Sequence, residues 1–192
     1  GPDDSNNPYF AYSSNGTSWS TPAKINNTAQ KFIPYAIAVN SSGLFVTVGR
    51  SGSTNYPTFS YSSNGSTWSE PSTMGGFTSY GEMRAVAVNS SGRFIAVGRD
   101  SSDRAICSIS TNGTSWSSPA VFSSTNYIPY AIAVSPSGLF VTVGTHSGND
   151  PWYSTSSDGI TWTSPSTFSS SSAIIYFPYG LTCSSSGQFV AF

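Results

Sequence analysis

Short apolar stretches alternate with runs of small polar residues along the whole chain. The stretch YAIAVNSSGLFVTVGR (35–50) returns as RAVAVNSSGRFIAVGR (84–99), YAIAVSPSGLFVTVGT (130–145) and YGLTCSSSGQFVAF (179–192). Its β-branched and small apolar residues are typical of strands buried on both faces, and NSSG between them is typical of a tight turn. The pattern therefore predicts a pair of antiparallel strands, at 35–39 and 44–50 in the first copy, four times over.

A second phrase recurs with the same period. It reads YSSNGTSW (12–19), YSSNGSTW (61–68), ISTNGTSW (109–116) and TSSDGITW (155–162), and its tryptophans lie 49, 48 and 46 residues apart. In the second copy we expect a third strand at 58–62 and a hairpin turn in which Asn64-Gly65 supplies the positive φ angles. We expect the fourth strand to carry Trp68 and to end at Glu70-Pro71.

Each unit thus contains four short strands in 46–49 residues. Such units cannot bury their own faces, and they are typical of propeller blades. The sequence predicts an all-β fold, a β-propeller of four four-stranded blades. We expect the N- and C-terminal strands to share one blade, which would remove the exposed sheet edge. The alternative is half of a larger ring that a second chain completes, which would make the protein a homodimer.

The domain organisation follows from the same register. Residues 9–192 are predicted to form a single repeat domain. Residues 1–8 are predicted to be a flexible N-terminus, in which Gly1-Pro2 has the form of a remnant of protease cleavage.

The second phrase resembles the Asp-box, or BNR, repeat of sialidase-type propellers, which runs roughly Ser-x-Asp-x-Gly-x-Thr-Trp. The resemblance covers all four units, although three have Asn in place of Asp and the spacer between Asp and Gly is absent. It implies a structural motif, in which the polar turn residue binds backbone N–H groups and the Trp packs between blades. The residues that carry it are Asn15, Trp19, Asn64, Trp68, Asn112, Trp116, Asp158 and Trp162.

The resemblance does not extend to catalysis. Sialidases have six blades and use three arginines, a Tyr–Glu pair and an Asp acid, and none of these positions can be matched residue by residue here. The only glutamates are Glu70 and Glu82, so we expect no enzyme activity. His146 is the sole histidine and has no partner at ligand spacing, so we expect no metal site and no cofactor.

The composition limits the classes of binding partner that we expect. Charged residues make up 8% of the chain and the net charge is −1, which argues against a nucleic acid partner. No apolar run approaches the roughly 18–20 residues of a membrane span. A surface rich in Ser, Thr and Asn favours a secreted or cell-surface protein, although no signal peptide is visible. Cys107 and Cys183 replace core residues of the sister units and are predicted to be buried free thiols.

The connections between units show where function is expected. The turns within the two repeated phrases are nearly constant, whereas the connections on the opposite face vary in sequence and carry thirteen of the fifteen charged residues. Loops that a rigid scaffold holds in place commonly bind ligands. The variable face is therefore the candidate binding face.

One set of equivalent positions should ring the mouth of the central channel. The first strand of each unit is expected to be the one nearest the axis, and we call these the inner strands. The set comprises their first residues, namely Tyr35, Arg84, Tyr130 and Tyr179. Arg50 and Arg99 end the second strands, and Trp152 precedes a third strand. Aromatic rings beside arginines suit sugars, so we expect a lectin-like, non-catalytic module for a glycan or small ligand. The alternatives are tyrosines that merely fill a narrow axis, and a structural or protein-interaction scaffold, as a segment of a larger repeat protein.

Overall fold

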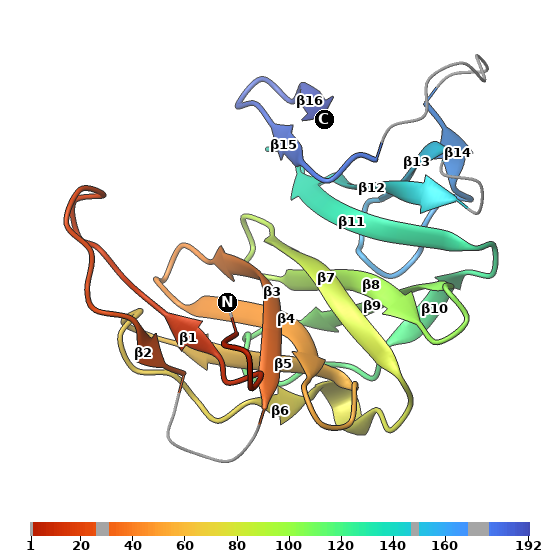
Figure 1. The fold of residues 1–192 in the computed structure, drawn as a ribbon. Coiled ribbons are helices and arrows are strands. Elements are labelled where there is room, and N and C mark those ends of the chain that lie inside the picture. The colour runs from red at the N-terminus through yellow and green to blue at the C-terminus, as the bar shows by residue number, and fades with distance from the viewer. Residues whose placement is uncertain (1, 26–30, 147–149, 169–176) are drawn as a thin grey trace.

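The computed structural model describes residues 2–25, 31–146, 150–168 and 177–192. These residues form three four-stranded and two two-stranded antiparallel sheets, with one short 3₁₀ turn at Met74–Gly76 and no α-helix. The sheets succeed one another along an arc (Figure 1). The predicted all-β propeller architecture with four-stranded blades is therefore confirmed.

Each complete blade is a meander in which neighbouring strands follow each other in the chain. Blade 1 comprises β3 (Phe32–Val39), β4 (Phe45–Ser51), β5 (Pro57–Ser62) and β6 (Ser72–Thr73). Blade 2 comprises β7 (Gly81–Val88), β8 (Phe94–Asp100), β9 (Ala105–Ser110) and β10 (Ala120–Ser123). Blade 3 comprises β11 (Tyr127–Val134), β12 (Phe140–His146), β13 (Pro151–Ser156) and β14 (Ser166–Thr167).

Two hairpins represent the fourth blade. The outer hairpin pairs β1 (Tyr9–Phe10) with β2 (Ala23–Lys24), and the inner hairpin pairs β15 (Leu181–Cys183) with β16 (Phe189–Ala191). They are separate sheets that lie at different ends of the arc (Figure 1). The predicted blade shared by the N- and C-terminal strands is thus not formed among the described residues of this chain. Three successive blade contacts curve the chain too little to bring the two hairpins together.

A bulge near the start of the first strand of each complete blade directs one side chain towards the axis. In blade 1 the register shifts between Pro34 and Ala36, which leaves Tyr35 as the extra residue. Gly49 pairs with Pro34 in this bulge, and a Cβ on Gly49 would overlap the carbonyl oxygen of Ile33. The other two blades have the same bulge at Arg84 and Tyr130, with the glycines Gly98 and Gly144.

The apolar core lies between adjacent blades. Three clusters repeat one arrangement, in which the second strand of one blade packs with the first strand of the next. The corresponding pairs in these clusters are Val46 with Val86, Ile95 with Ile132, and Val141 with Leu181. Burying one such aliphatic side chain contributes about 1.5–3 kcal/mol. These interfaces therefore hold the arc together.

The repeated outer turns are closed by their own side chains. The Oδ1 atom of Asn64 accepts hydrogen bonds from the N–H groups of Ser66 (2.9 Å) and Thr67 (2.8 Å). Ser62 Oγ accepts another from Gly65 N at 2.9 Å. Only the glycine has a positive φ, of 71°, so the expectation that Asn also supplies one is wrong. The amide serves instead as an acceptor, as do Asn15, Asn112 and Asp158 in their turns.

Asp158 is the one carboxylate among these four turn residues. Backbone hydrogen bonds from Ile160 and Thr161 lower its pKa to about 2. Its backbone oxygen also accepts a hydrogen bond from Arg93 Nη1 of blade 2 at 3.0 Å. The turn is therefore a link between neighbouring blades.

The fourth strands differ from expectation. In blade 1 this strand begins at Ser72, after Pro71, so Trp68 precedes the strand and does not belong to it. Proline has no N–H to donate to a strand ladder, and the residues before it are occupied by the turn network. Trp68 instead packs its ring 5.9 Å from that of Phe10.

The tryptophans of this motif show how blades meet at their outer parts. Trp116 of blade 2 is 7% exposed and contacts Phe59 of blade 1, with ring centroids 5.9 Å apart. The equivalent Trp19 on the outer hairpin is 65% exposed. Burial of this residue therefore depends on a preceding blade.

The two cysteines are both free. Cys107 is buried, as predicted, and burial raises the pKa of its thiol to about 11. Cys183 is only half-buried, because β15 has a neighbouring blade on one side alone. The prediction of a buried thiol is thus wrong for Cys183.

Candidate functional site

The four equivalent residues of the inner strands meet around one cavity. The cavity has a volume of about 250 Å³ and is lined by Tyr35, Arg84, Tyr130 and Tyr179. The rings of Tyr130 and Tyr179 lie 4.9 Å apart, and the guanidinium carbon of Arg84 lies 4.9 Å from the centre of the Tyr130 ring. We call this the axial cavity. The structure thus brings together the set that the repeat register singled out.

Glu82 lies behind the axial cavity and organises its charged side. The residue is 4% exposed. Its Oε1 atom accepts hydrogen bonds from the Nε atoms of Arg84 and Arg99, both at 2.8 Å. Its Oε2 atom accepts one from the Tyr35 hydroxyl at 3.2 Å and lies 3.7 Å from Arg50 Nε. Three arginines therefore converge on one buried carboxylate.

The two arginines that end strands β4 and β8 are anchored on their outer sides as well. Arg50 donates through Nη1 to the side-chain oxygen of Asn55. Arg99 donates through Nη1 to Asp103 Oδ1 at 2.5 Å. Asn55 and Asp103 both have positive φ, 58° and 55°, in equivalent loops. Blades 1 and 2 therefore share an arginine clamp, whereas blade 3 has Thr145 at that position.

The electrostatics keep this cluster ionised. Burial alone would raise the pKa of Glu82, but the charges and hydrogen bonds of Arg84 and Arg99 outweigh it and hold the pKa below its usual range. Burial raises the pKa of the Tyr35 hydroxyl, despite the hydrogen bond from Arg50. The axial cavity is therefore bordered by a neutral phenol and a fixed guanidinium at neutral pH.

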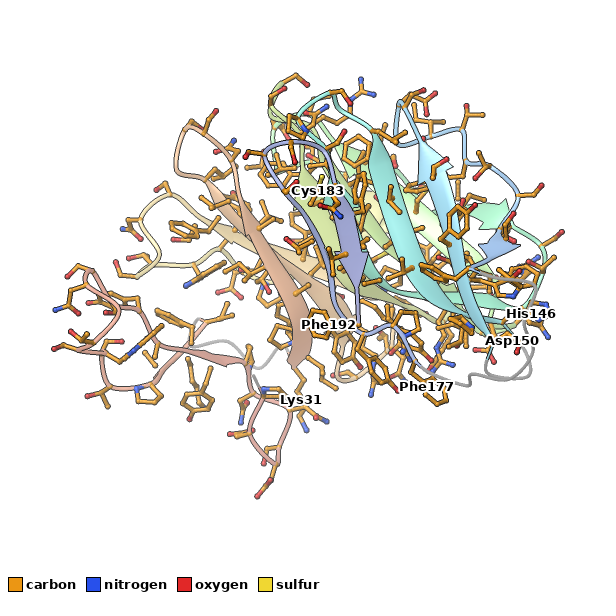
Figure 2. The ribbon with its side chains drawn as sticks, turned by 90° about the horizontal axis from the view of Figure 1, so that it is seen from above. Lys31, His146, Asp150, Phe177, Cys183 and Phe192 are labelled. Carbon is orange, nitrogen blue, oxygen red and sulfur yellow. The ribbon has the colours of Figure 1, made fainter. Side chains whose placement is uncertain are left out.

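Trp152 does not join the axial cavity. It lies on β13, paired with Gly144, and stacks on His146 with ring centres 4.3 Å apart and planes 11° apart. His146 N donates to Asp150 O at 3.0 Å, and Figure 2 shows these two residues side by side. Trp152 thus belongs to the β12–β13 connection on the rim.

Sequence reasoning did not include Glu82 among the site residues. The signal was available, because Glu82 occupies the position of Ile33 and Ile128 in the sister blades. An acid that replaces an apolar residue at a repeated position requires a partner, and Arg99 lies directly opposite it in the ladder. Periodicity alone does not reveal that Arg50 and Tyr35 reach it from another blade.

A second cavity lies between the outer hairpin and blade 1. Its volume is about 300 Å³, and Phe10, Ile25, Tyr35, Ile37 and Trp68 are among its lining residues. We call it the β1–β3 cavity. In a complete blade, the first two strands would occupy this position, next to β1 and against β3 of blade 1.

Comparisons with known proteins support the fold. No protein-family model and no curated protein matches the sequence. Among solved structures, a protein of unknown function from Dyadobacter fermentans matches with a TM-score of 0.65 at 12% identity, covering 91% of this chain and 60% of that one. A structure of NanB with Optactamide matches with a TM-score of 0.64 at 14% identity, covering 88% and 47%.

The intramolecular trans-sialidase from Ruminococcus gnavus matches with a TM-score of 0.55 at 17% identity, covering 84% of this chain and 41% of that one. This chain therefore spans 41–60% of the length of these structures. At such identities the likeness shows a sialidase-like propeller fold. None of the described segments forms an apolar helix of membrane-spanning length.

Proposed function

We propose that this protein is a non-catalytic, lectin-like propeller that binds a glycan or small ligand in the axial cavity. The observation that carries the proposal is the lining of that cavity by three tyrosines and one arginine. Aromatic faces stack on the C–H faces of sugars, and a guanidinium offers several donors in a fixed plane to hydroxyl groups.

Preorganisation supports this role. Arg84 is held by Glu82 and by the Tyr130 ring, so little side-chain freedom remains for a ligand to remove. Binding costs less when the contacting side chains are already ordered. The axial cavity thus presents fixed donors next to aromatic surfaces.

The state of Glu82 supports a non-catalytic role. A glycosidase acid needs a raised pKa, whereas the pKa of Glu82 is lowered and both of its oxygens are engaged by protein groups. The carboxylate therefore serves to position arginines.

The proposal is tested by screening the chain on a multivalent glycan array and titrating any positive ligand by intrinsic fluorescence. We expect Tyr179→Ala to weaken binding at least about tenfold, the equivalent of 1.4 kcal/mol. Tyr12→Ala is the matched control, because Tyr12 is also exposed, at 51% against 65% for Tyr179, and lies outside the axial cavity. Its affinity should be unchanged.

Equal effects of the two variants, or unchanged binding by Arg84→Ala in a chain with native circular dichroism, would place the ligand elsewhere. Hydrolysis of a reporter sialoside by the wild-type chain that is lost in Tyr179→Ala would contradict the non-catalytic assignment.

The second candidate is a structural or protein-interaction scaffold, which two exposed apolar sheet faces favour. On β3, Ile37 is 57% exposed, and on β16, Val190 is 52% exposed. A scaffold would show no glycan binding but would associate through these faces. We also propose a secreted or cell-surface location, on the basis of the Ser-, Thr- and Asn-rich composition; secretion of a tagged full-length protein into culture medium tests it.

A further inference from the structure

The two ends of the arc carry the halves of one missing blade contact. The three contacts inside the chain pack Val46 with Val86, Ile95 with Ile132, and Val141 with the partly buried Leu181. Continuing the repeat register, the next pair is Val190 with Ile37. Val86 and Ile132 are each 8% exposed, whereas Ile37 is 57% exposed. The chain therefore leaves one copy of a repeated apolar interface without its partner.

The sheet edges at the two ends are also complementary. Among the described residues, β16 is paired with β15 alone and β1 with β2 alone. In a complete blade the strand at the position of β16 pairs with the strand at the position of β1, as β4 pairs with β5. The two edges are thus the ones that pair with each other in a complete blade.

The outer hairpin already lies where a fourth blade would meet blade 1. Its Phe10 packs on Trp68 with ring centres 5.9 Å apart, the same separation as Phe59 and Trp116 between blades 1 and 2. The inner part of that position is the β1–β3 cavity, lined by Phe10, Ile37 and Trp68. The space that an inner hairpin would fill is therefore open and apolar.

We propose that the inner hairpin of a second copy of this chain fills this space, so that two chains complete each other's fourth blade in one two-fold ring. In each joint, β16 of one chain pairs with β1 of the other, and Val190 packs against Ile37. Trp19 of the outer hairpin then covers Tyr153 of the other chain's blade 3, as Trp116 covers Phe59. The ligand face proposed above is not needed for this association.

The curvature of the chain favours a second copy over closure within one chain. Three like interfaces leave Val190 and Ile37 exposed, and the arc superposes on two longer chains, of which it covers 60% and 47%. Two copies related by a two-fold axis form both joints at once, without changing the interfaces that already exist.

The first test is the native mass, measured by sedimentation equilibrium over a wide concentration range. The chain mass is 20.2 kDa, and we expect about twice that value. Ile37→Asp should reduce the mass to one chain while far-ultraviolet circular dichroism stays native. Ile160→Asp is the matched control, because Ile160 is 56% exposed on an outer turn, and it should remain dimeric.

A wild-type mass of one chain at every concentration, or open assemblies of increasing size, would overturn the proposal. So would dissociation by Ile160→Asp to the same extent as by Ile37→Asp.

A cysteine experiment identifies the joint itself. Chains with Ile37→Cys and chains with Val190→Cys, both carrying Cys183→Ser and different tags, are mixed and oxidised. We expect a disulfide between the two differently tagged chains. A variant that carries both Ile37→Cys and Val190→Cys tests closure within one chain. An internal cross-link in that variant, with no disulfide between the differently tagged single variants, would overturn the proposal.

Discussion

Blades 2 and 3 have the same backbone arrangement, but their first strands begin with different kinds of side chain, charged in blade 2 and uncharged in blade 3. Blade 2 begins with Glu82-Met83-Arg84, whereas blade 3 has Ile128-Pro129-Tyr130. Both strands have the same bulge and the same glycine opposite it. In blade 3, Thr145 Oγ1 donates to the Tyr130 hydroxyl at 3.3 Å, where blade 2 has an ion cluster.

The repeat thus fixes the backbone of each blade and leaves the residues at the axis free to vary. The register depends on a glycine that avoids a carbonyl oxygen and on apolar pairs between blades. None of these features involves the side chain that points to the axis. One wall of the axial cavity is therefore charged and the other is aromatic, although the supporting strands are alike.

The substitution Glu82→Leu should have the largest effect on stability. This change leaves three guanidinium groups around a site without a carboxylate. Removing one partner from a buried ionic group costs about 3–5 kcal/mol, and since these arginines are partly exposed we expect about 2–3 kcal/mol. Ile128→Leu at the equivalent position should cost less than about 1.5 kcal/mol. Urea unfolding of both variants measures the difference.

Equal losses in the two variants would show that Glu82 acts as ordinary packing. A four-residue variant gives blade 2 the residues of blade 3, through Glu82→Ile, Met83→Pro, Arg84→Tyr and Arg99→Thr. It should recover most of the stability lost by Glu82→Leu. If it does not, the charged residues of blade 2 must stabilise the fold by more than the neutralisation of one another's charge.

The second prediction concerns pH. The pKa of Glu82 in the folded chain lies below its ordinary value of 4.5, so its carboxylate contributes stability above that value. This contribution is lost as the pH falls through the folded pKa. As the pH falls from about 6 through the folded pKa of Glu82, wild type should therefore lose more free energy of unfolding than the four-residue variant. Asp158 also has a lowered pKa, but both chains contain it, so its effect cancels.

Chemical denaturation at each pH, with the two proteins measured in parallel, gives this difference directly. Parallel curves would show that Glu82 does not contribute to acid unfolding.

The smallest expected effect is that of Thr145→Arg, which gives blade 3 the arginine of blades 1 and 2. Without an acid at Ile128, the new guanidinium has no buried carboxylate to bind. Thr145 is 3% exposed and donates a hydrogen bond to the Tyr130 hydroxyl, so the change removes that bond and we expect a loss of about 0.5–1.5 kcal/mol. A stabilisation, in thermal and urea unfolding, would show that the arginine is favourable without a Glu82 equivalent.

Much of the fold follows from the sequence because the signal is repeated. The inner strands and the turns after them (NSSG, SPSG or SSSG) occur in all four units, which recur every 46–49 residues. The short outer strands were misplaced, because Pro71 and the hydrogen bonds of the Asn64 turn outweigh the β-propensity of the residues around Trp68. Pairing of the two terminal hairpins depends on the curvature between blades, which no local pattern encodes.

The axial residues were predictable for the same reason, since equivalent positions must meet at the axis of a propeller. The contacts around Glu82 were not, because Arg50 and Tyr35 belong to another blade and reach it only through tertiary packing. The stack of Trp152 on His146, likewise, depends on loop geometry that the variable connections do not share.

The serial arrangement of the core has a consequence for local opening. Because each apolar cluster joins only adjacent blades, unfolding free energy should be distributed along the arc like that of a short one-dimensional array. In the single chain of the Ile37→Asp variant, blade 2 has a complete blade on both sides, so its backbone amides should exchange with solvent most slowly. The inner hairpin of that single chain has a neighbour on one side alone and should open first. The most persistent part of the molecule is thus also the part that holds the arginine cluster.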